Sequence, residues 1–484
     1  MKLDCLTKKL TILSRTADAE TEITGIAYDS RAVKKGFAFV AIRGLQSDGH
    51  AFIPSAVQNG AAVVICEELP EAEVPYVQVP NSRLALSLMS AAWYGEPAGE
   101  MKMIGVTGTS GKTTSTHLIR HILKEAAGAK VGLVGTISNY IGDEELHTEF
   151  TTPESLELQG LFRRMADAGC NYAVMEVSSH SLAMDRVGGL HFDVAAYTNL
   201  SQDHLDFHKT MEEYASAKRK LFSMCSSACI NLDDAHASFM MSGAACPFFT
   251  TSASDPSADL YADRIELTPK GVSFDAVYRE KRVPVSLAIP GLFSVHNALT
   301  ALSVCMAAGI PLEDASAALK SAKGVKGRVE IVPTDGDYTI LIDYSHKPDA
   351  LENVLKTLRP VTRGRLVTLF GCGGDRDRQK RPIMGHVAAQ YSDFVIVTSD
   401  NPRTEDPDAI IDEIMEGLQN TSTPTYRESD RIKAIHYAID TAAPGDVLLL
   451  AGKGHEDYQI VGHEKHHMDE REIVADYLRE KSSL

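Results

Sequence analysis

The chain has 484 residues, of which 44% are hydrophobic and 23% are charged, proportions typical of a globular protein. Since domains average roughly 150 residues, this length is too great for one hydrophobic core and predicts about three domains. The 65 acidic residues outnumber the 48 basic ones and give a formal net charge of −17, which argues against non-specific binding to nucleic acid or to an anionic membrane surface.

The first segment, MKLDCLTKKLTILSR, contains no long apolar run, so we expect no secretory signal peptide. No stretch approaches the ~20 apolar residues that a membrane-spanning helix needs. The eight cysteines form no CxxC pair, and Cys225 and Cys229 have no matching second pair, which argues against a zinc site or a disulfide framework. We therefore expect a cytoplasmic protein with reduced thiols and without membrane or nucleic-acid partners.

Residues 1–100 contain short strand-like runs, among them GFAFVAI and AAVVI, with the helix-like segment IPSAVQNG between them. Prolines and glycines from Pro75 to Gly99 then interrupt regular structure and predict the end of a first domain. No internal repeat or low-complexity tract is visible in this part or elsewhere in the chain.

Residues 101–331 form the second predicted domain. An apolar run up to Val106 predicts a buried strand, and the segment after Lys112 has apolar residues at helical spacing. The runs YAVMEV and VAAYTNL are further candidates for buried strands. Because these strands alternate with helical stretches, we expect a mostly parallel sheet.

Residues 332–484 form the third predicted domain, with strands YTILIDY, RLVTLFG, DFVIVTSD and DVLLLAG, each followed by a turn and a helical stretch. This pattern is typical of a doubly wound, Rossmann-like sheet, where ligands bind beyond the carboxyl ends of the strands. Asp343, Gly371, Asp400 and Gly452 stand at those ends. The expected fold class is therefore α/β, with a central sheet like that of phosphate-loop ATPases and a Rossmann-like C-terminal domain.

A Gly-rich turn, GTSGKTT, lies between the strand and the helix that open the second domain. In that setting backbone N–H groups and the helix N-terminus cradle phosphate, the lysine reaches the β- and γ-phosphates, and the following threonine binds Mg²⁺. The strict GxxxxGK[ST] pattern is not met, because Val106 stands where its first glycine belongs, so a plain strand–helix turn is the alternative. The candidate ATP-binding residues of this loop are Gly108, Thr109, Ser110, Gly111, Lys112, Thr113 and Thr114.

Glu176 and His204 follow two other predicted strands. A carboxylate at the mouth of a buried strand is costly without a partner. Together with Thr113, these side chains supply oxygen and imidazole ligands that suit Mg²⁺ bridging ATP to an acyl group. Taken singly, Glu176 is equally consistent with a cap on the following turn, and His204 with a helix-start histidine beside Asp203.

The whole chain resembles the Mur ligase family. The motifs that carry the resemblance occur in one order: GVTGTSGKTT (105–114), TTPESLELQ (151–159), MEVSSHSLAMDRV (175–187), TNLSQDHLDFHKTMEEYASAKRKLF (198–222), GLFSVHNALTAL (291–302), KGRVEIV (326–332), DYSHKPDALENVL (343–355), GCGGDRDRQKRPIMG (371–385), DNPRTEDP (400–407) and AGKGHEDYQ (451–459).

The resemblance implies an ATP-dependent, Mg²⁺-requiring ligase of peptidoglycan precursor synthesis. ATP would phosphorylate the D-Glu carboxylate of UDP-N-acetylmuramoyl-L-Ala-D-Glu, and the amine of the incoming amino acid would attack the acyl phosphate. The products are an amide, ADP and phosphate. A carboxylate is a poor electrophile at neutral pH, so phosphorylation provides the leaving group, while the protein positions the reactants and neutralises charge.

The resemblance also assigns roles to individual residues. Lys218 matches the family's carbamylated lysine (N6-carboxylysine), which would hold Mg²⁺ with Thr113, Glu176 and His204; without the family it reads as one lysine on a solvated helix face. The implied catalytic residues are Lys112, Glu176, His204 and Lys218. The implied contacts to the UDP-linked precursor are Ser30, Thr151, Thr152, Ser178 and Arg186, although the DSR segment around Ser30 also reads as a plain turn. The further implied contacts to ATP are Asn297, Arg328, Asp343 and His346.

The segment Asp400-Asn401-Pro402-Arg403 resembles the motif of the family branch that adds meso-diaminopimelate. An arginine can bind the distal carboxylate of that substrate with two hydrogen bonds, whereas L-lysine has no second carboxylate. The alternative is that Arg403 pairs with Glu405 or Asp406 in a surface loop. The implied diaminopimelate contacts are Arg376, Asp400, Asn401, Pro402, Arg403, Gly452 and Glu456, the last meeting the distal ammonium.

One segment departs from the family pattern, because Ser345 and Lys347 stand in DYSHKP where DYAHTP is common. Three other functions stay open at this point: a lysine-adding member of the family, a ligase like folylpolyglutamate synthetase, and a nucleotide switch that catalyses no ligation. We expect only small-molecule partners and a monomer.

Overall fold

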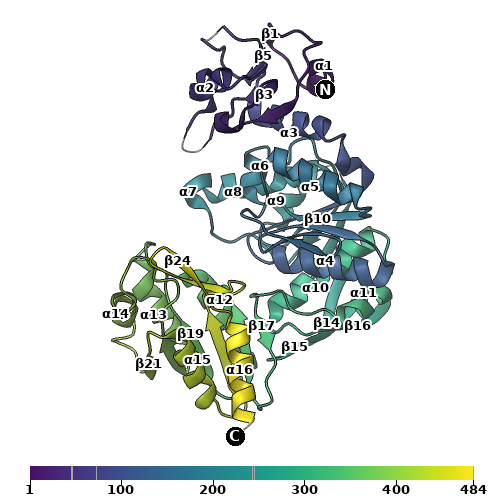
Figure 1. Ribbon diagram of the computed structural model, residues 1–484. Helices are drawn as coiled ribbons and strands as arrows, with labels where there is room; N and C mark the ends of the chain where they lie inside the picture. The colour runs from purple at the N-terminus through teal and green to yellow at the C-terminus, as the bar shows by residue number, and fades with distance from the viewer. Residues whose placement is uncertain (45–46, 72, 243, 245, 483–484) are drawn as a thin grey trace. The chain divides into compact units, whose positions relative to one another are not determined.

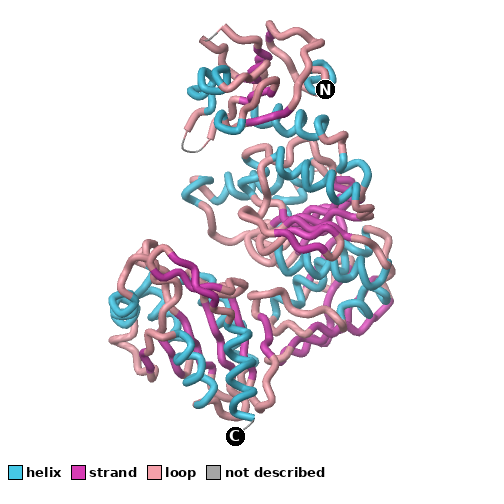
Figure 2. Tube along the Cα trace, in the orientation of Figure 1, coloured by secondary structure: helices cyan, strands magenta, loops and turns pink. Residues whose placement is uncertain are grey.

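The computed structural model describes residues 1–44, 47–71, 73–242, 244 and 246–482. The chain divides into two compact units, one of residues 1–251 and 300–311 and one of residues 252–299 and 312–484. Figure 1 follows the chain from the N-terminus to the C-terminus, and Figure 2 shows helices and strands alternating along it. In the part of the chain that the structure describes, no helix is both long and apolar enough to cross a bilayer.

The first sheet of unit 1 has five strands in the order β1-β5-β4-β3-β2, with only β1 antiparallel to its neighbour. Its strands are β1 (Ser14–Arg15), β2 (Gly25–Ala27), β3 (Phe37–Val40), β4 (Val63–Cys66) and β5 (Tyr76–Gln78). Its helices are α1 (Leu3–Thr7), η1 (Ser30–Ala32), η2 (Gly49–Phe52), α2 (Ile53–Gln58), α3 (Ser82–Trp93) and η3 (Pro97–Glu100). Alternate side chains of β3 and β4 enter two separate apolar clusters, so both faces of this sheet are covered.

The second sheet contributes the order β13-β12-β11-β6-β10-β7-β8-β9 to unit 1, and it is parallel from β13 to β7. Its strands are β6 (Lys102–Thr107), β7 (Val131–Val134), β8 (Asn139–Ile141), β9 (Glu144–Leu146), β10 (Tyr172–Glu176), β11 (Phe192–Tyr197), β12 (Cys225–Asn231) and β13 (Phe248–Ser252). Its helices are α4 (Lys112–Ala127), α5 (Ser155–Asp167), α6 (Ser179–Ala183), α7 (Leu205–His208), α8 (Met211–Arg219), η4 (Lys220–Ser223) and α9 (Ala237–Met241). The predicted parallel sheet is therefore present.

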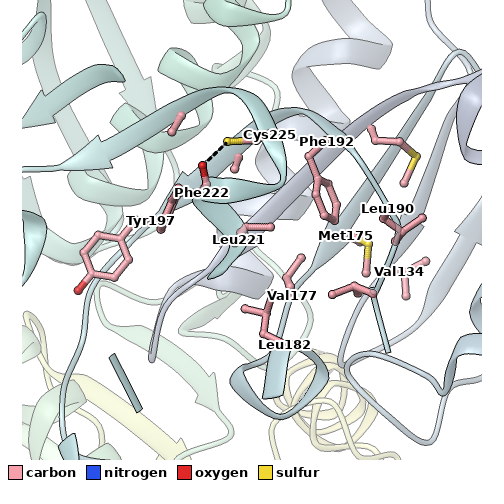
Figure 3. Close-up of a cluster of buried hydrophobic side chains, with 14 of the residues drawn as sticks. Val134, Met175, Val177, Leu182, Leu190, Phe192, Tyr197, Leu221, Phe222 and Cys225 are labelled. Atoms are coloured by element: carbon pink, nitrogen blue, oxygen red, sulfur yellow. Dashed lines mark hydrogen bonds between the residues drawn. The ribbon is translucent and has the colours of Figure 1, made fainter. Parts of the chain in front are cut away.

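One face of this sheet packs into a large apolar cluster, part of which is drawn in Figure 3. Met175 from β10, Phe192 from β11 and Leu182 from α6 are all buried in it. Phe222 of η4 is also buried there, and its carbonyl oxygen accepts a hydrogen bond from Cys225 Sγ at 3.7 Å. Burial of this face fixes the strands firmly, so the loops at their carboxyl ends start from rigid positions.

Unit 2 begins with an antiparallel ribbon of β14 (Leu260–Thr268), β15 (Gly271–Tyr278) and β16 (Lys281–Leu287). It also contains α11 (Leu312–Leu319) and the part of α10 (Leu292–Ala307) that precedes residue 300. Exposed and buried side chains alternate along β16, a pattern typical of a strand with one solvated face.

The last sheet has the order β17-β18-β22-β19-β20-β21, parallel except for β17. Its strands are β17 (Glu330–Val332), β18 (Thr339–Asp343), β19 (Leu366–Phe370), β20 (Phe394–Val397), β21 (Thr425–Arg427) and β22 (Val447–Ala451), and a hairpin of β23 (Tyr458–Val461) and β24 (Glu464–His467) follows. Its helices are α12 (Pro348–Leu358), η5 (Arg359–Val361), α13 (Lys380–Tyr391), α14 (Pro407–Glu416), α15 (Arg431–Asp440) and α16 (Glu470–Ser482). Two apolar clusters cover its two faces, as a doubly wound sheet requires.

Candidate functional site

The Gly-rich loop joins β6 to α4, as the sequence predicts. Gly108 and Gly111 have φ of +151° and +84°, and a Cβ on Gly108 would come within 1.8 Å of the Thr198 hydroxyl oxygen. Both positions therefore require glycine. The loop opens a helix of 16 residues, whose N-terminal N–H groups attract anions.

The end of β11 supports this loop from the side. Thr198 Oγ1 donates to the Ser110 carbonyl oxygen at 2.7 Å, and the Ser110 N–H donates to Asn199 Oδ1 at 3.0 Å. Lys112 Nζ folds back onto the carbonyl oxygens of Gly108 and Thr109, at 2.9 and 3.0 Å. The ammonium group is thereby held over the turn that would receive a phosphate.

Glu176 ends β10 with a completely buried side chain. Its Oε2 accepts hydrogen bonds from the hydroxyls of Thr113 and Thr136, each at 3.0 Å, and its Oε1 accepts from the Thr136 N–H at 2.8 Å. The alternative that Glu176 caps the following turn is wrong, because Ser178 caps α6 instead. Thr136 was not singled out from the sequence, although its place just after the buried strand β7 could have indicated it.

Lys218 lies on α8 with only 1% of its surface exposed, so the interpretation as a solvated lysine is wrong. Its Nζ donates to the Gly108 carbonyl oxygen at 2.7 Å and lies 4.5 Å from the centre of the Tyr214 ring. Burial, aided by the nearby charge of Lys112, lowers the pKa of Lys218 well below its ordinary value. The structure thus brings Lys218 to the same loop as Lys112.

His204 has a half-exposed side chain and a φ of +54°. Its ring lies 4.8 Å from that of His180 and 6.2 Å from that of Tyr214, whose hydroxyl is 3.0 Å from Thr109 Oγ1. His204 therefore stands on the rim of the loop that Lys218 contacts.

The predicted metal ligands combine hard oxygen donors, Thr113 and the buried carboxylate of Glu176, with an imidazole. This chemistry fits Mg²⁺. Over the residues that the model describes, no three His, Cys, Asp or Glu side chains gather as a metal site, but the predicted set contains only two such side chains, Glu176 and His204.

The candidate contacts to the UDP-linked precursor fall in two places. Ser30 begins η1, which Asp29 caps, and both residues line a cavity of about 640 Å³ together with Arg31. The DSR segment is therefore a turn that also lines a cavity.

The other four precursor candidates come together around β10. Thr152 Oγ1 donates to the Glu176 carbonyl oxygen at 2.8 Å, and Arg186 Nη1 donates to the Thr152 carbonyl oxygen at 3.0 Å. The Ser178 N–H donates to Thr152 Oγ1 at 3.2 Å, while Thr151 Oγ1 lies 3.0 Å from Thr136 Oγ1.

A cavity of about 580 Å³ lies beyond the carboxyl ends of the last sheet. Six of the seven diaminopimelate candidates line it: Arg376, Asp400, Asn401, Arg403, Gly452 and Glu456. Pro402 does not. His346, which the resemblance assigned to the nucleotide, also lines this cavity, as do Lys347 and Lys380.

Arg403 reaches this cavity from a strained backbone, with a φ of +52°. Its Nη1 donates to the carbonyl oxygens of Gly374 and Asn401, at 2.8 and 3.5 Å. Glu405 instead forms an ion pair of 2.8 Å with Arg381, so the alternative pairing of Arg403 is wrong. Among the described residues, no carboxylate forms an ion pair with Arg403, and its guanidinium keeps its capacity for an external carboxylate.

Lys453 contacts two residues that line this cavity, and sequence reasoning missed it. Its fully buried Nζ donates to Asn401 Oδ1 at 3.0 Å and to Glu456 Oε2 at 2.9 Å. The same Glu456 oxygen accepts from Asn401 Nδ2 at 2.9 Å. These bonds orient two predicted ligand-binding side chains, and the position of Lys453 directly after β22 was the signal available in the sequence.

The remaining nucleotide candidates lie around the start of the last sheet and in α10. Asp343 ends β18, where its carboxylate accepts from the Val329 N–H at 2.8 Å and from the Ser345 hydroxyl. The departure from the family pattern at Ser345 therefore adds a hydrogen bond to Asp343. Arg328 lies 5.4 Å from the centre of the Tyr344 ring, and among the described residues its buried Nε has no hydrogen-bond partner. Asn297 is buried within α10.

Burial also lowers the pKa of His346, whose Nδ1 lies 2.9 Å from the Tyr344 carbonyl oxygen. A neutral imidazole at this edge can serve as a hydrogen-bond partner for a bound ligand without adding positive charge.

Comparisons with known proteins extend over nearly the whole chain. Residues 22–94 match the model described as "Mur ligase family, catalytic domain", residues 106–305 the "Mur ligase middle domain", and residues 327–454 the "Mur ligase, glutamate ligase domain". Among curated proteins, the UDP-N-acetylmuramoyl-L-alanyl-D-glutamate–2,6-diaminopimelate ligase of Clostridium botulinum is 45% identical over 99% of this chain and all of its own length. The ligase of that name from Caldanaerobacter subterraneus is 47% identical over 95% of both chains.

Solved structures agree with these matches. A structure of UDP-N-acetylmuramoyl-L-alanyl-D-glutamate–2,6-diaminopimelate ligase superposes with a TM-score of 0.76 and 32% identity, covering 100% of this chain and 99% of the other. MurF from Acinetobacter baumannii shares the fold, with a TM-score of 0.63 at 21% identity, over 99% and 98% of the two chains. The predicted α/β class with three domains is confirmed.

Proposed function

Because this chain belongs to the Mur ligase family of ATP-dependent ligases, we propose that it adds meso-diaminopimelate to the D-Glu carboxylate of UDP-N-acetylmuramoyl-L-Ala-D-Glu. The observation that carries this choice of amino acid is Arg403, which lines a cavity and forms no ion pair with a carboxylate of the described chain. The product would be a precursor of peptidoglycan, and we place the reaction in the cytoplasm.

In this proposal the reaction has two steps. An oxygen of the D-Glu carboxylate attacks the γ-phosphorus of ATP, and ADP leaves. The amine of diaminopimelate then attacks the acyl carbon, phosphate leaves with the electron pair of the broken C–O bond, and the nitrogen loses a proton. Such a reaction depends mainly on positioning and on neutralising the charge of the phosphates.

Residues 108–114 would hold the phosphates of ATP, since this loop presents N–H groups at a helix start and the ammonium of Lys112. Asn297, Arg328, Asp343 and His346 would contact the rest of the nucleotide. Thr113, Glu176, His204 and Lys218 would hold Mg²⁺, which neutralises phosphate charge when bound.

Lys218 would take part as a carbamate. Lowering of the pKa by burial increases the fraction of uncharged amine, whose nitrogen can attack the carbon of CO₂ and release a proton. The product carries a negative charge and two oxygens, which suit a hard cation. Its place beside Gly108 supports this role.

Three further assignments complete the proposal. Ser30, Thr151, Thr152, Ser178 and Arg186 would bind the UDP-linked precursor. Arg403 and Arg376 would bind carboxylates of diaminopimelate, with Asp400, Asn401, Gly452 and Glu456 around its amine groups. Residues 1–100, 101–331 and 332–484 would act as the precursor-binding, ATP-binding and amino-acid-binding domains of a monomer.

The test is ADP release by the purified protein with Mg-ATP and UDP-N-acetylmuramoyl-L-Ala-D-Glu, comparing meso-diaminopimelate with L-lysine. We expect turnover with diaminopimelate alone. Turnover with L-lysine would overturn the assignment of Arg403, and hydrolysis of ATP without any amine acceptor would indicate a nucleotide switch. If neither amine supports ADP release but a folate with glutamate does, the result would favour a folylpolyglutamate-type ligase.

A further inference from the structure

Arg431 and Glu470 form an ion pair whose side chains are both completely buried. Arg431 is the first residue of α15 and Glu470 is the first residue of α16. The helix dipole disfavours a cation at a helix start, so the stability of α15 does not explain the arginine. A buried ion pair also adds little net stability, because the cost of removing both charges from water offsets their attraction.

The hydrogen bonds of Arg431 show what it connects. Its Nη1 donates to the carbonyl oxygen of Ser399 at 3.1 Å, and its Nη2 donates to that of Ala451 at 2.9 Å. Its Nε donates to Glu470 Oε1 at 2.8 Å, which fixes the plane of the guanidinium. One rigid side chain therefore holds the carboxyl ends of β20 and β22, which β19 separates in the sheet.

Both carbonyl groups stand directly before segments that line the 580 Å³ cavity. Asp400–Arg403 follows Ser399, and Gly452–Glu456 follows Ala451. Asn401 and Glu456, one from each segment, meet at 2.9 Å, and the buried Lys453 bonds to both. Arg431 thus connects the two segments at their base, while Lys453 and the Asn401–Glu456 hydrogen bond connect them beside the cavity.

We propose that Arg431, held by Glu470, is a positioning residue for amino-acid selection, which sets the separation of the Asp400–Arg403 and Gly452–Glu456 segments. This proposal rests on the proposed function, because it takes the cavity to be the diaminopimelate site. A planar guanidinium can reach two carbonyl oxygens at once, whereas an ammonium or an apolar side chain cannot do so in the same geometry.

The chain offers a matched control at the opposite edge of the same sheet. Arg365 pairs with the buried Asp446 at 2.6 Å, directly before β19 and β22. Arg365→Met removes an ion pair from this sheet without touching the carboxyl edge. Arg431→Met removes the guanidinium at that edge, and Arg431→Lys keeps the charge but not the planar pair of donors.

Two measurements on the full-length variants test the proposal. We expect Arg431→Met to raise KM for diaminopimelate by about 10–100-fold, with KM for the UDP-linked precursor nearly unchanged, because small displacements of binding groups have large effects. Arg431→Lys should recover part of this loss. Arg365→Met should leave KM for diaminopimelate unchanged, whatever its effect on the melting temperature. Equal KM changes in Arg431→Met and Arg365→Met would overturn the proposal.

Hydrogen exchange supplies a readout that needs no substrate. We expect Arg431→Met to speed amide exchange in peptides covering residues 400–403 and 452–456, and Arg365→Met to leave them protected. Unchanged exchange there would refute the positioning role even if the enzyme used another amine. The wild-type enzyme could instead be inactive with diaminopimelate while the variants show the expected exchange pattern. That result would refute the proposed function and the selection role, and Arg431 would remain only as the connection between the two segments.

If Arg431→Met does not fold, Glu470→Gln is measured in the same way. A wild-type exchange pattern and a wild-type KM for diaminopimelate in Glu470→Gln would overturn the proposal.

Discussion

Lys218 Nζ donates a hydrogen bond of 2.7 Å to the carbonyl oxygen of Gly108, 110 positions earlier in the chain. This contact brings a buried lysine from α8 to the turn that precedes Lys112. The positive charge of Lys112 disfavours a second charge on Lys218, which adds to the effect of burial in lowering the pKa of Lys218. The relationship links the helix to the phosphate loop and motivates the first prediction.

Lys218→Ala should nearly abolish ADP release, because the variant cannot form the carbamate that we propose as an Mg²⁺ ligand. High concentrations of bicarbonate or formate should partly restore turnover by placing a small anion in the vacated space. Lys220→Ala, at an exposed position two residues later, is the control and should behave as wild type. Wild-type activity of Lys218→Ala would refute the proposal that Lys218 acts as a carbamate.

Arg403→Ala should raise KM for diaminopimelate by an amount equivalent to about 2–3 kcal/mol, the scale of a lost charged pair in a binding site. The measurement is the dependence of ADP release on diaminopimelate concentration. Arg378→Ala is the control, since Arg378 is an exposed arginine of a neighbouring motif and pairs with Glu413. An unchanged KM in Arg403→Ala would remove the basis for the specificity assignment.

Thr136→Val should lower kcat, because its hydroxyl donates to Glu176 Oε2 at 3.0 Å and holds that carboxylate in place. The loss should be about tenfold, equivalent to about 1.4 kcal/mol for one hydrogen bond to a charged group. Thr136→Ser keeps the hydroxyl and should retain most activity. If both variants match the wild type at saturating Mg-ATP, Thr136 has no part in orienting Glu176.

Arg381→Met should destabilise the last domain by about 3 kcal/mol, because it leaves two carboxylates without the buried cation between them. Arg381 bonds to Glu405 at 2.8 Å and to Glu413 at 2.9 Å. Chiefly the hydrogen bonds from Arg381 lower the pKa of Glu405 from 4.5 to about 2.

The pH dependence of this effect has a definite sign. A lowered folded-state pKa contributes stability that is present above the unfolded value of 4.5 and is lost as the pH falls towards 2. Denaturant unfolding should therefore show the largest difference between wild type and Arg381→Met near neutral pH, with the difference shrinking between pH 4.5 and 2. A difference that grows on acidification would contradict the proposed interaction.

Much of the architecture was predictable because it depends on short-range patterns. The buried strands ending at Thr107, Glu176 and Asp343 are largely apolar runs bounded by polar turns, and parallel sheets bury both faces of such strands. The Gly-rich loop follows from the local requirement for positive φ at Gly108 and Gly111.

The site was predictable only where a residue follows a strand or matches a family motif. Thr136 and Lys453 follow strands, but neither has a residue type that marks it as functional by itself. Arg431 opens a helix, and its two carbonyl partners, Ser399 and Ala451, lie 32 and 20 positions away. No local pattern predicts such contacts, because backbone carbonyl groups occur in every residue.

The sequence by itself determined the strands, the phosphate loop and the family, since each depends on residues that are close together in the chain or on motifs in a fixed order. Only the tertiary structure decided that Glu176 meets Thr113 and Thr136, that Lys218 is buried against Gly108, and that Arg403 has no carboxylate partner among the described residues. The physical reason is strand order. Placing β10 and β11 on either side of β6 brings distant carboxyl ends to one edge, and burial there then changes the charge and the partners of each side chain.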